Sequence, residues 1–335
     1  MAGNDRLRVA FWNVENLFEP GTHPPGPGGN PAGRGPQTPD ELDSKVARLA
    51  ECINAFFSDK GPDLLGLAEV HSQRILQRLE SNLGDRYGMI WEQAGSGGET
   101  GLAVLGRLSA VSGLTKVDVY RPSAMARPRS MIVRCKFANV SEPVLFVVNH
   151  WKSRMAKGVG PFAASRDREQ TADWLGDWLS KSSRDTCVIV TGDFNAEPVE
   201  RPFSEFRLRS TRHFSTATWP RATPAYLYNT SWKFLTEPMT WGQQMAGGVV
   251  VQEDRPKRTH VSGNYVWDQL MVSGRAMKNG PIVLLEDTVG YHRDHHNSEY
   301  NQNGILLPVR WKYQGPGACV GASDHYPLVA EFEVI

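Results

Sequence analysis

The segment VIVTGDFNAEP (residues 188–198) joins an apolar run to a polar end. The run Val188 to Val190 has no polar face, which is typical of a strand buried beneath helices on both sides. It leads directly into Asp193 and Asn195. Because rigid scaffolds place reacting groups at strand ends, the segment predicts a buried strand that carries part of a functional site.

Other short apolar runs extend this pattern along the chain. They suit buried strands of an α/β sandwich, and they lie at residues 8–12, 64–68, 102–105, 131–137 and 144–148. The final segment, Tyr326 to Ile335, alternates between apolar and polar residues instead. We therefore expect it to form a strand with one exposed face.

Polar residues of one chemical kind follow several of these runs. They are Asn13 and Glu15, Glu69, His150, Asp193 and Asn195, Asp268, and Asp324 with His325. Carboxylate and amide oxygens suit hard cations such as Mg²⁺ or Mn²⁺, whereas zinc would call for more His or Cys. The pattern predicts a hard-metal site for phosphate chemistry.

Three helices are expected between the strands. The first begins at a capping box, with Thr38 as the N-cap residue, Pro39 at the first helical position and Glu41 reaching back. Helical spacing of apolar residues predicts the second over residues 72–83 and the third over residues 166–179.

The chain is expected to form one domain over residues 1–335, because no linker divides it. Residues 20–39 are rich in Pro and Gly and predict a mobile surface loop. The histidines of YHRDHHN (residues 291–297) lack the spacing of a recognised zinc motif, so a polar loop is expected there.

Composition places the chain among ordinary globular proteins, with 40% hydrophobic and 22% charged residues. A net charge of +1 argues against a strongly basic protein that binds a long stretch of nucleic acid, but it allows a few local contacts with phosphates. The N-terminus lacks the apolar region of a signal peptide, and no apolar run is long enough to cross a membrane. We therefore expect a cytoplasmic protein with no membrane segment.

Six segments together resemble the successive motifs of the endonuclease/exonuclease/phosphatase superfamily. They are FWNVENLF (11–18), LLGLAEV (64–70), NHWKSR (149–154), TGDFNAEP (191–198), YVWDQLMVS (265–273) and SDHYPLVAEF (323–332). They span most of the chain in the family order. GDFN combined with a late SDH is more specific than either motif alone.

The resemblance implies a fold and a metal site. The fold is a four-layer α/β sandwich in which helices flank two central, mostly antiparallel or mixed sheets, as in deoxyribonuclease I-like proteins. Glu69 and Asp324 would hold Mg²⁺ or Mn²⁺, with Asn13 and Glu15 contributing directly or through water.

The same resemblance implies catalytic roles. Asp193 and Asn195 would orient the attacking water and the scissile phosphate. His325 would contact the phosphate, while Asp268 accepts its other N–H and fixes the tautomer.

Further residues match the deoxyribonuclease I-like members of the family. His150 is similar to their second catalytic histidine, and Glu99 matches the position of its carboxylate partner. Arg127 resembles the phosphate-binding arginine. Arg129 remains an alternative, because the spacing to the strand that ends at Phe137 is ambiguous.

The resemblance favours a metal-dependent DNA endonuclease that hydrolyses phosphodiester bonds, with nucleic acid as its partner. The AP endonuclease branch fits less well, since Val266, Trp267 and Gln269 stand where it carries an arginine and a tyrosine. The alternative is a phosphatase or phosphodiesterase acting on a lipid head group, an inositol phosphate or a nucleotide. An inactive binding module of the same fold is least favoured. DNA and RNA remain open as substrates, and residues 20–39 and 200–262 are expected to set selectivity.

Overall fold

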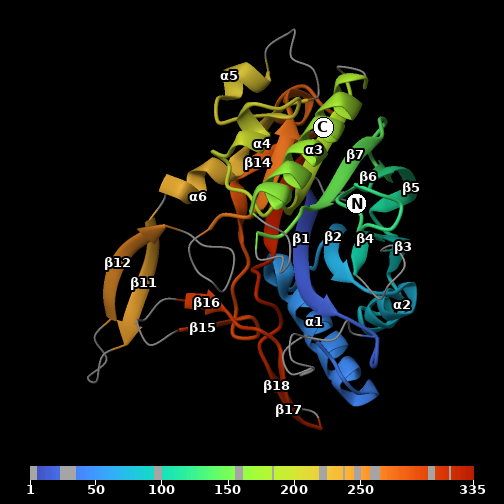
Figure 1. Cartoon of the computed structure of the whole chain (residues 1–335), viewed down its shortest axis with the longest axis vertical. Helices are drawn as coiled ribbons and strands as arrows, with labels where there is room; N and C mark the ends of the chain where they lie inside the picture. The colour runs from blue at the N-terminus through green and yellow to red at the C-terminus, as the bar shows by residue number, and fades with distance from the viewer. Residues whose placement is uncertain are drawn as a thin grey trace.

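Two mixed β-sheets lie face to face at the centre of the molecule, and helices cover their outer faces (Figure 1). This arrangement confirms the predicted four-layer α/β sandwich. The structure is a computed structural model, and it describes residues 6–22, 35–93, 100–154, 161–182, 185–218, 225–236, 238–244, 250–256, 265–300, 306–316 and 318–335.

The first sheet has six strands in the order β14-β19-β1-β2-β4-β3. Their bounds are β1 Arg6–Leu17, β2 Leu64–Val70, β3 Tyr87–Glu92, β4 Gly101–Arg107, β14 Ile282–Tyr291 and β19 Leu328–Val334. Strands β1 and β2 are parallel, and the other neighbours are antiparallel. Strand β19 alternates between buried and more exposed residues, as its sequence predicts.

The second sheet has seven strands in the order β5-β6-β7-β8-β13-β10-β9. Their bounds are β5 Val111–Tyr120, β6 Ser130–Phe137, β7 Val144–His150, β8 Cys187–Asp193, β9 Arg209–Thr211, β10 Tyr226–Asn229 and β13 Asp268–Ser273. The pairs β7–β8 and β9–β10 are parallel, and the rest are antiparallel. Every residue of β8 is buried, as expected for a strand with no polar face.

The three long helices form where the sequence predicts them. They are α1 (Pro39–Asp59), α2 (Gln73–Asn82) and α3 (Pro161–Ser180). The Thr38 hydroxyl accepts a hydrogen bond from the Glu41 amide at 3.2 Å, which confirms the predicted N-cap. Helix α3 begins at Pro161 rather than at Arg166. Phe162 and Ala163 of its first turn are exposed, so they do not continue the buried apolar face from which the helix was predicted.

Smaller elements complete the fold, and most lie where the sequence has weak periodicity. The short helices are α4 Arg201–Ser204, α5 Phe214–Ala217, the 3₁₀ helix η1 Thr230–Trp232, α6 Lys233–Thr236 and α7 Gly274–Met277. Three hairpins pair β11 Pro238–Gln244 with β12 Val250–Pro256, β15 Ser298–Tyr300 with β16 Leu306–Pro308, and β17 Lys312–Gly315 with β18 Ala318–Val320. The β11–β12 hairpin projects from the sandwich (Figure 1).

Alternation along the strands produces three apolar layers. In β1, Phe11 packs between the two sheets, while the next residue, Trp12, packs under α1. In β8, Ile189 lies between the sheets, while Val188 packs under α3. Each central strand therefore buries both faces, which accounts for its continuous apolar sequence.

One ion pair within this core is also buried. Arg8 at the start of β1 donates two hydrogen bonds from its guanidinium to Asp63, at 2.9 and 2.7 Å. The Arg8 and Asp63 side chains are 9% and 2% exposed. The pair holds β1 against the residue that precedes β2.

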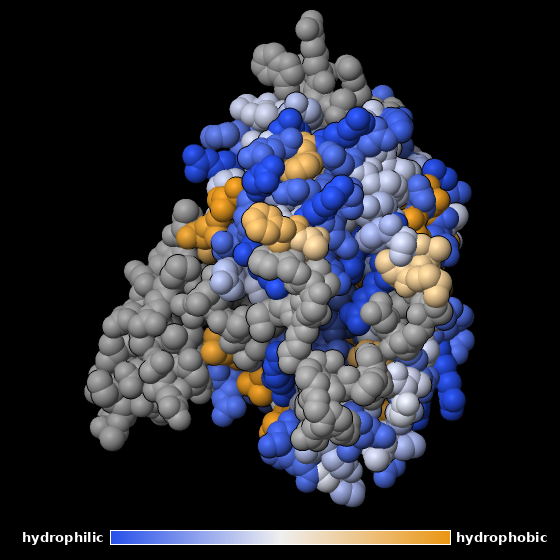
Figure 2. Space-filling model, viewed as in Figure 1, coloured by the Kyte–Doolittle hydropathy of each residue, from blue (hydrophilic) through white to orange (hydrophobic). Residues whose placement is uncertain are grey.

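Among the described residues on the face shown in Figure 2, most are hydrophilic, and the hydrophobic ones form small separate patches. Phe162, at the start of α3, is the most exposed large apolar side chain among the described residues, at 91%. No helix within those residues combines the length and apolar character needed to cross a membrane.

Candidate active site

Three neighbouring strands of the second sheet bring polar side chains together at one edge. In the sheet register, His150 at the end of β7 pairs with Asp193 at the end of β8. Asp193 pairs in turn with Asp268 at the start of β13. All three residues are buried. The structure therefore gathers these predicted site residues into one group.

Asn13 connects this group to the first sheet. Its Nδ2 donates to Glu69 Oε1 at 3.3 Å and to Asp193 Oδ2 at 3.2 Å. Asn13 pairs in register with Ala68, so the parallel strands β1 and β2 bring Asn13 and Glu69 together. Glu69 also lies beside His150, with 3.5 Å between Oε1 and Nε2. A single amide thus spans the two sheets.

Three predicted site residues have a left-handed backbone. The φ angles are 48° at Glu15, 67° at Glu69 and 47° at Asn195. This conformation costs a non-glycine residue about 1–2 kcal/mol. At Glu69 the cost is offset in part by the Asn16 amide, which donates to Oε2 at 2.6 Å. Such strain persists only where surrounding contacts hold the residue, and it clusters at functional sites.

His325 completes the group around Asp193. Its Nδ1 lies 2.7 Å from Asp268 Oδ2, and its Nε2 lies 3.7 Å from Asp193 Oδ2. Burial works against the charge of His325, but the carboxylates of Asp268 and Asp193 outweigh it and raise its pKa well above the usual range. The two carboxylates therefore favour the protonated form of His325 beside Asp193.

The two histidines of the site differ in charge. Burial lowers the pKa of His150 to about 4, although Glu69 opposes this shift. Burial also raises the pKa of Asp193 to about 7, against the charge of His325. His150 is thus neutral near pH 7 and able to accept a proton, whereas His325 is able to donate one. Opposed protonation states of this kind suit acid and base chemistry at one site.

The turn after β8 fixes Asn195 against Asp193. The backbone amide and the Nδ2 of Asn195 both donate to Asp193 Oδ1 at 3.0 Å, and Nδ2 also donates to the Trp151 carbonyl at 3.2 Å. A Cβ atom at Gly192 would lie 2.4 Å from the carbonyl oxygen of Asn149. The glycine of the GDFN motif is therefore required by the close approach of β7 to β8.

Two cationic side chains that the sequence analysis did not identify, Arg310 and Lys45, lie near Glu15 and Asp324. Arg310 bridges both carboxylates, pairing with Glu15 and, at 2.7 Å, with Asp324 Oδ2. The buried ammonium of Lys45 donates to the backbone carbonyl of Glu15. Burial and the charge of Asp324 raise the pKa of Glu15 to about 7, and burial lowers that of Lys45.

The oxygen donors on this side of the site fit a hard cation. Glu69, Asp324, Glu15 and Asn13 offer only carboxylate and amide groups, which are ligands that Mg²⁺ and Mn²⁺ accept. Glu15 Oε2 is buried and has no hydrogen-bond partner among the described residues. Within the part of the chain that the structure describes, however, no three His, Cys, Asp or Glu side chains form a ready-made metal group. The donors fit by their chemistry.

The two candidate arginines have different surroundings. Arg129 pairs with Asp167 of α3, at 3.0 Å between Nε and Oδ1. The charge of Arg127 acts on both Glu69 and His150. Burial works to raise the pKa of Glu69, but His150 and Arg127 outweigh it and the pKa of Glu69 is lowered. Arg127 also helps burial to lower the pKa of His150. Glu99, the expected partner of His150, lies outside the described residues.

An aromatic stack lies beside the Asn195 turn. The rings of Tyr265 and Trp267 are parallel, with centroids 4.9 Å apart and an interplanar angle of 5°. Arg154 lies over the Tyr265 ring at 5.6 Å and donates from Nε to the Asn195 carbonyl at 2.9 Å. Arg154 and Tyr265 belong to separate sequence motifs, so only the fold brings them together.

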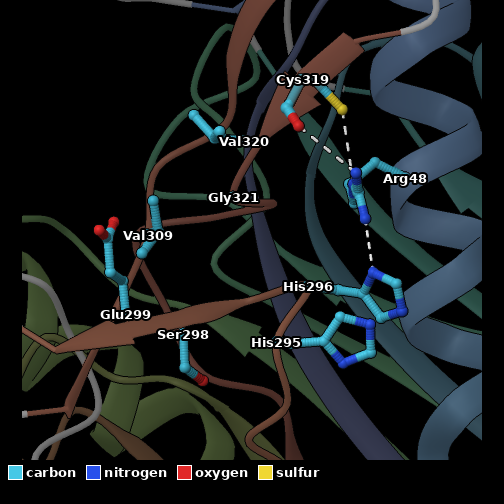
Figure 3. Close-up of a pocket in the computed structure, with 9 residues that line it drawn as sticks. All are labelled: Arg48, His295, His296, Ser298, Glu299, Val309, Cys319, Val320 and Gly321. Atoms are coloured by element: carbon cyan, nitrogen blue, oxygen red, sulfur yellow. Dashed lines mark hydrogen bonds between the residues drawn. The ribbon is translucent and has the colours of Figure 1, made fainter.

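A separate cavity of about 260 Å³ lies between α1 and the segments around β15 and β18 (Figure 3). Arg48 contacts His296 and lies 3.4 Å from Cys319 Sγ. His295 and His296 belong to a turn, in line with the polar loop expected there. The wall contains none of the predicted site residues, but Val309, directly before Arg310, forms part of it.

Comparisons with known proteins agree with this architecture. Residues 8–217 match the Endonuclease/Exonuclease/phosphatase family, whereas no curated protein matches the chain. Among solved structures, the fold is similar to humanized TDP2 of D. rerio (TM-score 0.55, 14% identity, covering 98% of this chain and 99% of that one). It is also similar to an endonuclease/exonuclease/phosphatase family protein of Bacteroides thetaiotaomicron (0.53, 15%, covering 98% and 97%). A third is D. rerio TDP2 complexed with a single-strand DNA product (0.52, 14%, covering 98% of each chain).

Proposed function

Because the chain belongs to the Endonuclease/Exonuclease/phosphatase family, whose members are hydrolases acting on phosphoester bonds, we propose that it is a nuclease that cuts phosphodiester bonds in DNA. The observation that carries this proposal is the buried group in which Asp193 Oδ2 lies 3.9 Å from His150 Nε2 and 3.7 Å from His325 Nε2. Both sheets supply side chains to the site, which supports one catalytic domain over residues 1–335.

Positive charge at the site would bind the phosphodiester. His325 presents a protonated imidazole, held by Asp268 at 2.7 Å. Arg127 adds its charge on the side of Glu69 and His150, while Arg129 is engaged by Asp167. Preorganised cations of this kind stabilise the charge that develops on phosphate oxygens in the transition state.

Asp193 and His150 would orient the attacking water. Asp193 Oδ1 is occupied by two hydrogen bonds from Asn195, so Oδ2 faces Asn13 and the two histidines. His150 Nε2 lies 3.9 Å from Asp193 Oδ2. Asp193 and His150 would together accept the proton that the attacking water releases. His325 Nε2, protonated, would donate a proton to the leaving oxygen.

Mg²⁺ or Mn²⁺ would be held by Glu69 and Asp324, with Asn13 and Glu15 contributing. When bound, such an ion polarises the phosphoryl oxygen and offsets charge on the leaving group. A nearby divalent charge would also lower the pKa of Asp193 and Glu15, so that both carboxylates ionise when the ion binds.

The exposed Arg154 guanidinium, backed by the partly buried Tyr265 and the buried Trp267, supports a substrate that carries bases. Nucleobases stack on aromatic rings and on arginine planes largely independently of sequence. The stack lies beside the Asn195 turn, next to the position proposed for the scissile phosphate. The single-strand DNA product bound by the related TDP2 structure favours the same class of substrate.

Hydrolysis assays test the proposal directly. The substrates are supercoiled plasmid, single-stranded DNA, RNA and bis-p-nitrophenyl phosphate, each with Mg²⁺, Mn²⁺ or EDTA. We expect metal-dependent cleavage of DNA. Turnover of the small diester or of a phosphomonoester, with no polynucleotide cut, would instead favour the small-molecule phosphatase or phosphodiesterase. The absence of turnover with any metal would favour an inactive binding module.

A further inference from the structure

Arg310 occupies one side of the acidic site. Its guanidinium joins Glu15 to Asp324, two residues that are far apart in sequence and that would both help to hold a metal ion. The Arg310 side chain is 49% exposed, whereas those of Glu15 and Asp324 are 7% and 11% exposed. A partly solvated cation therefore closes over two buried carboxylates.

The backbone on both sides of the site holds Arg310 in this position. The Val309 amide donates to the Asn297 carbonyl at 3.0 Å, and the Val309 carbonyl accepts from the Ala322 amide at 2.9 Å. Gly321 has a φ of 64°, and a Cβ atom there would lie 2.4 Å from the Arg310 carbonyl oxygen. Figure 3 shows Val309 beside Gly321 at the cavity behind this segment. Arg310 is thus presented to the site by fixed backbone.

The side chain of Arg310 also differs in function from the other nearby cation. Lys45 is buried and donates its hydrogen bond to the backbone carbonyl of Glu15. Arg310, in contrast, binds the carboxylate oxygens themselves. The positive charge that a divalent cation would supply at Asp324 is therefore already supplied by Arg310.

We propose that Arg310 is a tethered cation that competes with the divalent metal ion for Asp324 and Glu15, and so sets how tightly the site binds metal. This inference rests on the proposed metal-dependent function and adds a positioning residue to it. A divalent ion at Asp324 must share the carboxylate with Arg310 or displace it, and the two cations repel each other. Removing the guanidinium leaves the donor oxygens in place and removes that repulsion.

Metal binding to the full-length protein tests this competition without any assay of activity. Free Mn²⁺ is measured by electron paramagnetic resonance during titration of the wild type, Arg310→Gln and Arg310→Lys. We expect Arg310→Gln to bind Mn²⁺ about tenfold more tightly, which is a modest effect because the guanidinium is half exposed and screened by solvent. Arg310→Lys should fall between the two, since it keeps the charge but cannot bridge two carboxylates.

Arg6→Gln is the matched control. Arg6 lies at the start of β1, at the opposite end of the strand from Asn13, and pairs with Glu331 of β19. This variant loses the same charge and should bind Mn²⁺ like the wild type. Affinity of Arg310→Gln equal to or weaker than that of the wild type, with wild-type binding intact and circular dichroism unchanged, overturns the competition. If no protein binds Mn²⁺, the proposed metal-dependent function fails and the competition fails with it.

Discussion

The imidazole of His325 and the carboxylate of Asp268 form a buried pair, with Nδ1 2.7 Å from Oδ2. Asp268 is itself held in place, because its backbone carbonyl accepts a hydrogen bond from the Tyr291 hydroxyl at 2.8 Å. The acidic partner fixes both the orientation and the charge of the histidine, as second partners of catalytic histidines commonly do. The pair is therefore the clearest place to test protonation at the site.

Replacing Asp268 with Asn should lower the pKa of His325, because the imidazolium loses the negative charge that stabilises it. In the metal-free wild type, we expect His325 to stay protonated above the ordinary histidine range and His150 to stay neutral down to about pH 5. Proton NMR titration of the imidazole signals measures both. An unchanged His325 titration in Asp268→Asn would show that the pair does not control its charge.

Asp193→Asn should reduce the turnover of DNA by about 10²–10⁴-fold, because it removes the charge that orients water and balances His325. The amide has nearly the same shape, so the circular dichroism spectrum should not change. Asp287→Asn, an exposed residue of β14, is the matched control and should keep wild-type turnover. Equal turnover by Asp193→Asn and Asp287→Asn would show that the charge of Asp193 is not needed for catalysis.

Glu69→Gln should weaken Mn²⁺ binding on the order of 100-fold, since loss of a charged ligand costs at least as much as loss of a supporting residue. Cleavage should require a correspondingly higher metal concentration, and EDTA should abolish it in the wild type. Glu333→Gln, exposed on β19, serves as the control. Unchanged metal affinity in Glu69→Gln would place the metal elsewhere.

Asp63→Ala should lower the free energy of unfolding by about 3–5 kcal/mol, because the buried Arg8 would lose its partner. Glu331→Ala removes the partner of Arg6, whose side chain is 61% exposed, and should cost at most about 1 kcal/mol. Urea denaturation of the two variants gives the comparison. Equal losses would mean that burial does not distinguish the two ion pairs.

Gly192→Ala should cost about 1–3 kcal/mol of stability and also reduce turnover. The new Cβ would push against the Asn149 carbonyl and move β7 away from β8, displacing Asp193. Denaturation and turnover assays measure the two effects. Gly290→Ala is the control, because a Cβ atom there would meet nothing within 4 Å. It measures the effect of replacing a glycine with alanine when no steric clash follows.

The sequence predicted buried central strands because they carry continuous apolar runs, and its resemblance to the endonuclease/exonuclease/phosphatase superfamily implied the four-layer sandwich. It also predicted the residues at the ends of β7 and β8, since they follow such runs directly. Arg310 and Lys45 could not be found in this way. Lys45 lies on the buried side of an amphipathic helix, and Arg310 lies between short hairpins with no periodic pattern, so only tertiary structure brings them to Glu15.

The Asn13 amide, which contacts Glu69 on one sheet and Asp193 on the other, has a consequence for how such a protein can change in evolution. Loops and hairpins around the edge can vary in length and sequence without moving the amide. The apolar layer between the sheets has far less freedom. A substitution there that slides one sheet by about 1 Å would separate the two carboxylates that Asn13 joins, and a misplacement of this size can cost about 10²-fold in rate. Selection for activity should therefore act on the packing between the sheets almost as strongly as on the polar residues themselves.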